Sequence, residues 1–345
     1  MLFLPTAGTA LPWFTAVSLL ALVLALAALT LGPVEITPER VLAAIAGRGA
    51  PADVAIVGEI RLPRLLLGIA VGASLAMSGA ALQGMLRNPL ADPGLIGVTA
   101  GASLGAVAVI VLGDVVAGGL PQGLRPWLLP IAAFAGGGIV IGFVLALARR
   151  STGTPVATLI LAGVAINAIA SAGIGALVYL SDDRQLRDLT FWSMGALGGA
   201  GWDLAAAAAL LAALALPILL IHARALDLMQ LGEQAAFHAG LDTERVKRRI
   251  ALATALGIGA VTAAAGPIGF IGLVAPHLAR LVIGPAHGLL LPAAGLMGVV
   301  LVLAADLAVR LVVPPAEPPI GLATSLIGGP FFLWLLLRRA PSSNA

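Results

Sequence analysis

Apolar runs of about 20 residues recur along the whole chain, and this length fits a membrane-crossing helix. The first run, 11–31, is long enough for a helix to cross a bilayer core of about 30 Å. Further runs, bounded by proline, glycine or charge, lie at roughly 62–86, 93–113, 125–149, 153–180, 201–222, 245–266, 268–284, 286–312 and 320–338. Because 268–284 is short and contains Pro276 and Arg280, we expect a half-span or a re-entrant helix there. We predict an all-α polytopic membrane protein with about ten transmembrane helices.

Composition supports this class and excludes several others. Hydrophobic residues make up 60% of the chain and charged residues only 10%, against about 25% charged in soluble domains. The chain has no cysteine, and its four histidines show no metal-ligand spacing, so we expect no metal site and no cofactor in this subunit. The net charge of +3 gives no reason to expect a nucleic-acid partner.

Glycines at four-residue spacing suggest close helix packing inside the bundle. Small residues at this spacing let helices approach closely in lipid, where dispersion drives association. The sets with this spacing are Gly68 and Gly72, then Gly97, Gly101 and Gly105, and then Gly138 and Gly142. We interpret all three sets as packing faces without a functional role.

The distribution of basic residues predicts the topology. An even number of spans puts both termini on one side, and the clusters at 149–150, 245–249 and 338–339 then share that side, which is the cytoplasm by the positive-inside rule. We treat residues 1–345 as a single transmembrane domain. On this topology Arg61, Arg64 and Arg310 lie outside, where they require another explanation.

A polar segment at 222–249 interrupts the apolar pattern and contains Lys247, the only lysine of the chain. Its apolar residues recur at helical spacing, and Gly232 and Gly240 are placed to end short helices. These apolar residues are Leu228, Leu231, Ala235, Ala236 and Leu241. One interpretation is a docking segment for a partner. The other is a solvated basic loop that only fixes topology, which suits the RVKRR run at 245–249.

Sequence signatures of catalysis and of ion coupling are absent. The chain has no GxxxxGK(S/T) phosphate loop, no GxSxG motif and no paired carboxylates in a plausible cleft, so we expect no catalytic residue. Acidic residues fall almost entirely at the ends of the predicted spans, whereas proton-coupled carriers usually bury them within a span. The pattern indicates a conduit whose energy comes from a partner protein.

The segment RLPRLLLGIAVGASLAMSGAALQGMLRNPLADPGLIGVTAGAS at 61–103 resembles the signature of the FecCD family of ABC importer permeases. Further blocks resemble the family in the same order, at 159–167, 189–199, 231–241, 266–281, 303–321 and 328–339. The resemblance implies a type II ABC importer fold like that of the cobalamin permease. It also implies a functional homodimer, two ATPase subunits that bind ATP and magnesium, and a periplasmic substrate-binding protein. The expected location is the bacterial inner membrane.

The resemblance gives the polar segment a role as a cytoplasmic coupling loop that contacts the ATPase. In the family this loop forms short helices that sit in a cleft of the ATPase and transmit the closure of its nucleotide sites. The residues that we place at the centre of this contact are Leu231, Gly232, Glu233, Ala236 and Gly240.

The resemblance also assigns the outer arginines. Arginines at the positions of Arg61, Arg64 and Arg310 meet glutamates of the binding protein in the related cobalamin permease, and arginine suits this role because its planar group pairs bidentately with carboxylates. Arg310 also lies four residues after Asp306, so a pair within one helix is an alternative. Arg61 and Arg64 are alternatively snorkelling anchors.

Two further segments correspond to the translocation gate of the family. Asn88 and Leu90 belong to one cytoplasmic constriction, and Thr154 and Thr158 belong to the other. The spacing between Arg150 and Leu161 is about two residues longer than in the cobalamin permease. Which hydroxyl narrows the pore is therefore open, and the NPLADP segment is alternatively a tight turn.

The cargo is the least constrained part of the assignment. The segment 181–199 resembles haem permeases more than the cobalamin permease, which favours haem as the transported chelate. A ferric siderophore or cobalamin is the alternative within the family. An ion-coupled secondary transporter and a structural or receptor membrane protein are the alternatives outside it.

Overall fold

The computed structural model describes residues 7–117, 119–148, 156–312, 314 and 316–339, and these residues form helices and connecting loops without a strand. The long helices are α1 (Ala7–Thr30), α4 (Leu62–Leu86), α5 (Val98–Ala117), α6 (Leu128–Ala148), α7 (Val156–Leu180), α9 (Trp202–Ile221), α12 (Thr243–Ala265), α13 (Ile271–Ile283), α14 (His287–Val312) and α15 (Ile320–Arg339). The short helices are α2 (Pro38–Ile45), α3 (Pro51–Ala55), α8 (Asp183–Ser193), α10 (Ala223–Gln230) and α11 (Glu233–His238). A π-helical turn covers Ile56–Arg61, and 3-10 turns cover Pro93–Ile96 and Gln122–Trp127.

The polytopic helical fold predicted from the sequence is confirmed. Within the described residues, seven helices are long and apolar enough to cross a membrane, and three shorter apolar helices lie at 98–113, 271–283 and 320–333. Together they match the ten predicted runs. The run 268–284 forms the 13-residue helix α13, which begins only after Phe270, in left-handed backbone conformation.

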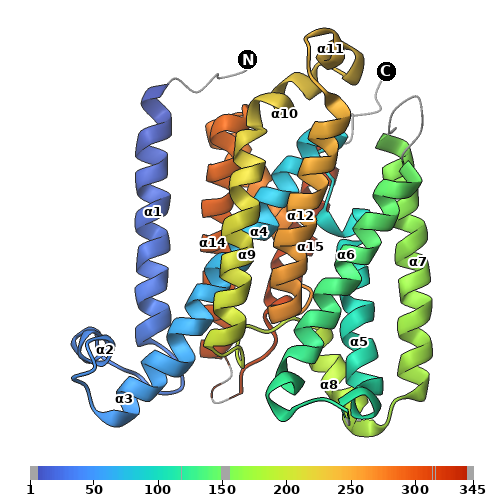
Figure 1. Ribbon diagram of the computed structural model, residues 1–345. Coiled ribbons are helices and arrows are strands. Elements are labelled where there is room, and N and C mark those ends of the chain that lie inside the picture. The colour runs from blue at the N-terminus through green and yellow to red at the C-terminus, as the bar shows by residue number, and fades with distance from the viewer. Residues whose placement is uncertain (1–6, 118, 149–155, 313, 315, 340–345) are drawn as a thin grey trace.

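Short helices sit at both ends of the bundle (Figure 1). We call the end that carries α10 and α11 the α11 end, and the end that carries α2, α3 and α8 the α2 end. α1 begins at the α11 end and runs to the α2 end. The sequence analysis did not predict α8, although Asp182 and Gln185 form a reciprocal capping box at its start.

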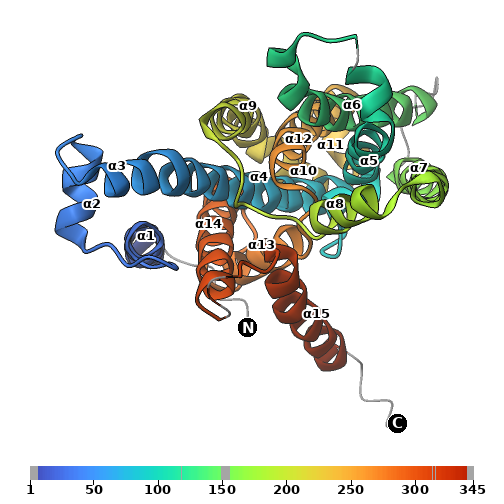
Figure 2. The same ribbon diagram turned by 90° about the horizontal axis from the view of Figure 1, so that it is seen from below.

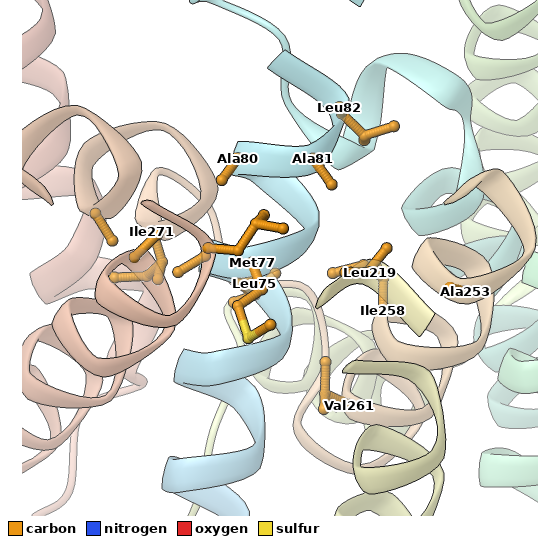
Figure 3. Packing of buried hydrophobic residues seen from close by; sticks show 14 of the residues in the cluster. Leu75, Met77, Ala80, Ala81, Leu82, Leu219, Ala253, Ile258, Val261 and Ile271 are labelled. Atoms are coloured by element: carbon orange, nitrogen blue, oxygen red, sulfur yellow. The ribbon is translucent and has the colours of Figure 1, made fainter. Parts of the chain in front are cut away.

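α4 is the central helix of the bundle, with α14, α9, α12 and α13 around it (Figure 2). Nearly every side chain between Leu67 and Leu86 is buried. Figure 3 shows Ile271 of α13 on one side of α4 and apolar side chains of α9 and α12 on the other. α4 therefore has protein, not lipid, on nearly all of its surface.

Some of the predicted glycine faces pack closely and others do not. A Cβ at Gly72 would lie 2.5 Å from the carbonyl oxygen of Gly298, so the backbones of α4 and α14 touch there. A Cβ at Gly101 would meet the carbonyl oxygen of Gly136 at the same distance, which joins α5 to α6. The packing role predicted for Gly138 and Gly142 is wrong, because no described atom lies within 4 Å of the Cβ position of either. The face of α6 that packs is the one carrying Gly136.

Candidate functional site

The α11 end is closed by α10 and α11, which fold back over the bundle (Figure 1). Gly232 (φ +110°) separates the two helices and Gly240 (φ +87°) ends the second, so both occupy backbone conformations that favour glycine. Leu231 is 73% exposed and Phe237 is 66% exposed. Phe237 lies on α11 and Leu231 directly before the first glycine turn, so this segment presents two large apolar side chains to solvent.

The predicted coupling residues divide into exposed and supporting groups. Leu231 is exposed, whereas Ala236 is fully buried, so Ala236 supports α11 from below and offers no surface to a partner. The exposed aromatic side chain of Phe237 was missed by the sequence analysis. The sequence does contain a signal for this exposure, because Phe237 lies in a polar segment and has no long apolar run beside it.

Lys247 joins α11 to the long helix α12. Its side chain is only 2% exposed, and its Nζ lies 2.7 Å from Glu233 Oε1 and 2.9 Å from Glu244 Oε1. Both carboxylates are partly exposed, while the ammonium group is enclosed between them. A solvated loop would leave this lysine in water, as it leaves Arg248 and Arg249. The RVKRR run therefore combines one internal lysine with exposed arginines.

α10 is fastened to the bundle through polar contacts with α4 and α14. Gln230 Nε2 donates to the carbonyl oxygen of Gly84 at 2.7 Å. Asp227 Oδ1 accepts from the backbone N–H of His287 at 2.9 Å and lies 2.7 Å from Nδ1 of the same histidine. Movement of α10 is thereby linked to the ends of two membrane helices.

At the α2 end, Arg64 connects α4 to α14 and to the segment that follows α14. Its Nε and Nη2 donate to Asp306 Oδ1 at 3.0 and 2.8 Å, and its Nη1 donates to Glu317 Oε2 at 2.5 Å. The Arg64 side chain is 8% exposed. The guanidinium group that was predicted to face a binding protein is therefore already paired with two carboxylates of its own chain. The sequence analysis did not predict Glu317 as one of these partners.

Arg61 and Arg310 are also buried and paired within the chain. Arg61 donates to the carbonyl oxygens of Leu29 and Val34. Arg310 Nε lies 3.2 Å from Asp306 Oδ2, which is the intrahelical pair that the i,i+4 spacing indicates. Two of the three outer arginines come together, because Arg64 and Arg310 share Asp306, whereas Arg61 binds backbone carbonyls. Docking of a binding protein on these arginines stays a prediction.

An additional arginine is exposed at the α2 end. Arg40 on α2 holds Asp53 with two hydrogen bonds of 2.8 and 2.6 Å, while half of its own side chain remains in solvent. The hydrogen bond and the charge of Asp53 raise the pKa of Arg40. α2 was absent from the predicted helices, so the sequence analysis gave this residue no role.

The segment after α4 is a tight polar turn, as its proline and asparagine content indicates. Asn88 Oδ1 accepts from the backbone N–H of Leu90 at 2.9 Å, and Leu90 is exposed. Asn167 on α7 donates to the carbonyl oxygen of Gly94 at 3.0 Å and so joins α7 to the 3-10 turn that follows. The sequence analysis missed this contact, whose two residues lie outside the predicted gate segments.

The second predicted gate segment is only partly described. Thr158 lies near the start of α7 and is half-buried. Thr154 lies outside the described residues. Among the residues that the structure covers, no group of three or more histidine, aspartate or glutamate side chains is arranged to hold a metal ion.

The fold and these contacts define a polytopic helical membrane protein with an exposed helical segment at one end. The chain matches the model of the FecCD transport family over residues 19–338 and belongs to this family. The family consists of ABC transporter permease subunits, which are multi-pass membrane proteins and are not themselves catalytic. The sequence resemblance to FecCD permeases is thus confirmed.

Named relatives cover most of the chain. It is 47% identical over 281 residues to the hemin transport system permease protein HmuU of Yersinia pestis, covering 81% of this chain and 83% of the relative. It is 40% identical to the vitamin B12 import system permease protein BtuC of Salmonella typhi, covering 95% of each. A solved ABC transporter, assigned to the metal-chelate type and inward-facing, superposes with a TM-score of 0.83 and 29% identity, covering 94% of this chain and 98% of the other.

Proposed function

We propose that this chain is the permease subunit of an ATP-driven ABC importer that carries haem across the bacterial inner membrane. The observation that carries the choice of haem is the 47% identity to a hemin permease over 81% of the chain. Identity to cobalamin permeases is lower, at 44% for the one from Halobacterium salinarum and 40% for the one from Salmonella typhi. Cobalamin and ferric siderophores are the competing cargoes within the same importer class.

The proposed assembly contains a second copy of the chain, two ATPase subunits that bind ATP and magnesium, and a periplasmic substrate-binding protein. The α11 end faces the cytoplasm in this proposal, with both termini on that side. The basic cluster 245–249 at the start of α12 supports this orientation.

α10 and α11 are the proposed coupling segment. The exposed Leu231 and Phe237 would enter the ATPase cleft, and the turns at Gly232 and Gly240 would fix the angle of α11. A force on α11 then reaches α12 through Glu233 and Lys247, and it reaches α4 and α14 through α10. These two routes connect an ATPase contact to the helices at the centre of the bundle.

At the other end, the buried arginine cluster would align the surface that receives the binding protein. Arg64, Asp306 and Arg310 tie α4 to α14, so the two outer helix ends keep a fixed relation. Exposed ion pairs between this surface and the binding protein would contribute about 1 kcal/mol or less each, so they would mainly orient the binding protein. The contact between Asn167 and Gly94 would transmit movement of α7 to the turn that contains Asn88 and Leu90.

Reconstitution tests the importer class. The chain is co-expressed with its ATPase and binding protein, and the purified complex is placed in liposomes. We expect haem-loaded binding protein to raise ATP turnover and to drive haem uptake. Uptake that proceeds without an ATPase and follows an imposed pH gradient would instead establish an ion-coupled carrier.

A cargo panel tests the choice of haem. The binding protein is titrated with haem, cobalamin and several ferric siderophores, and binding is followed by tryptophan quenching. We expect haem to bind most tightly and to be the cargo that stimulates ATP turnover in the complex. Preference for cobalamin or a siderophore would change the cargo and leave the importer class intact.

A further inference from the structure

An apolar cavity of about 170 Å³ opens between α6 and α9 near the α2 end, with α12 as its floor. α6 and α9 both pack on α12 and lie on either side of it in Figure 2. The floor carries only the small side chains of Ala260, Ala263 and Ala264, and the α9 wall includes Ala207 and Ala208. The space between α6 and α9 is therefore left unfilled by the described residues.

The cavity follows about two turns of α6 and about two turns of α9. It runs from Trp127, directly before α6, to Phe134, and on α9 it runs from Leu204 to Leu211. Each stretch is about 10 Å long at 1.5 Å per residue. One leaflet contributes about 15 Å to the hydrocarbon core of a bilayer. The cavity therefore extends through most of the leaflet at the α2 end.

The mouth of the cavity lies on a part of the bundle that has little protein around it. α6 and α9 belong to helices that are long and apolar enough to cross a membrane, yet only 22% of the apolar stretch of α6 and 28% of that of α9 are buried. Ile131, which lines the mouth, is 59% exposed. In the single chain, the mouth therefore opens toward the hydrocarbon of the bilayer.

The wall of this cavity suits neither water nor a polar ligand. Every lining side chain is apolar except for the indole N–H of Trp127. A buried water needs about two to four polar partners, and an empty cavity forfeits the dispersion contacts of its lining atoms. An apolar chain restores these contacts, and dispersion is the attraction that holds packed groups together in lipid. The wall therefore selects a hydrocarbon chain.

Two charged side chains of opposite sign lie where the cavity begins at the α2 end. Arg125 is two residues before Trp127, and Asp203 is directly before Leu204. Both are exposed. Tryptophan indoles are enriched at the level of the lipid headgroups, and a guanidinium group pairs well with phosphate. A headgroup with a phosphate and an ammonium group offers a partner to both charges, whereas an anionic headgroup suits Arg125 alone.

We propose that this cavity binds one acyl chain of a phosphatidylethanolamine molecule from the leaflet at the α2 end. The acyl chain lies over the alanines of α12, with the phosphate beside Arg125 and the ammonium group beside Asp203. The bound chain contacts α6 and α9 together, so it fixes the separation of two helices that both pack on α12. The site depends on the membrane location of the bundle and not on the proposed cargo or ATPase.

Lipid binding is measured on the purified full-length chain. The chain is placed in nanodiscs that contain phosphatidylethanolamine, phosphatidylglycerol and phosphatidylcholine in equal amounts. After transfer to a mild detergent, native mass spectrometry counts each retained lipid and reports how many chains each particle contains. We expect one phosphatidylethanolamine to be retained per chain. A photoreactive group on its acyl chain should attach to residues 127–134 and 204–211.

The informative variant is Ala207→Leu, because its longer side chain fills the cavity from the α9 wall. We expect at least fivefold less retained phosphatidylethanolamine, with a thermal midpoint in lipid-free detergent equal to or above that of the unmodified chain, since leucine fills empty space. The control is Ala206→Leu, which adds the same side chain at an exposed position of α9 and should retain the lipid. Asp203→Asn should lower the preference for phosphatidylethanolamine over phosphatidylglycerol at least threefold.

Several results would overturn the proposal. Equal retention by Ala207→Leu and Ala206→Leu would show that the retained lipid lies elsewhere. Attachment of the photoreactive chain outside the two stretches would show the same on the unmodified chain, even if Ala207→Leu does not fold. A preference for phosphatidylglycerol would exclude the zwitterionic headgroup. If Ala207→Leu converts dimers to monomers and leaves the lipid count per chain unchanged, the cavity is a contact between two copies.

Discussion

Replacement of Lys247 by methionine is expected to detach α11 from α12 without unfolding the bundle. Breaking a fully buried ion pair costs about 3–5 kcal/mol, and an exposed pair contributes about 0–1 kcal/mol. Here the ammonium group is enclosed, but Glu233 and Glu244 are 34% and 44% exposed and regain water when the lysine is removed. We therefore expect a cost of about 1–2 kcal/mol, between those limits.

This cost should appear locally, in the docking of α11. A change of 1–2 kcal/mol corresponds to a factor of about 5–30 in an equilibrium population. Amide hydrogens of 233–238 in Lys247→Met should therefore exchange about 5–30 times faster in hydrogen-exchange mass spectrometry. The amides of α4 should keep their protection, because the two ion pairs of Lys247 join α11 to α12. In the reconstituted complex, transported cargo per ATP hydrolysed should fall.

Two matched variants separate this effect from a general loss of charge. Arg248→Met removes an exposed cation one residue away and should leave exchange in α11 unchanged. Glu233→Gln leaves Lys247 paired with Glu244 and should give a smaller increase in exchange. Unchanged exchange of α11 in Lys247→Met would refute the idea that this lysine holds the segment.

Three further predictions follow from the packing and the ion pairs. Gly72→Ala should lower the thermal midpoint of unfolding strongly, because its Cβ would meet the α14 backbone, whereas Gly142→Ala should leave it nearly unchanged. Tryptophan fluorescence during heating measures both midpoints. Arg64→Gln should cost about 3–5 kcal/mol by leaving Asp306 buried with a weakened partner, while Arg40→Gln should cost about 1–2 kcal/mol, because Arg40 is half-exposed although its partner Asp53 is buried; chemical denaturation of the purified protein measures both costs. Phe237→Ala should weaken association with the ATPase at least tenfold in pull-down titrations with no change in thermal midpoint, since this side chain is exposed; unchanged association would remove α11 from the contact.

The sequence predicts the membrane helices well because their length and apolarity are local properties. The run 62–86 coincides with α4, and 286–312 differs from α14 by one residue at its start. Short amphipathic helices such as α2 escape this criterion, since eight residues give too little apolar signal. Glycine spacing likewise identifies candidate faces but not which face meets a neighbour, which explains the error at Gly138.

For the candidate sites, the sequence and the resemblance identified residues but not their partners. Arg64 and Asp306 are separated by 242 positions, so no local pattern reveals that the first is already satisfied by the second. The same holds for Gln230 and Gly84, which meet only after α10 folds across α4. Burial of an arginine depends on such long-range contacts, and this is why the predicted topology and the resemblance indicated a surface role.

The central position of α4 has a consequence for the order in which this protein is made. The helix is synthesised long before α9, α12 and α14, so its final neighbours do not yet exist when it leaves the ribosome. Ser74, Ser78 and Gln83, which end up buried in protein, must first lie in lipid or beside the insertion machinery. Assembly of the bundle therefore finishes only after translation reaches the last third of the chain, and a chain that stops there leaves α4 without the neighbours that bury it.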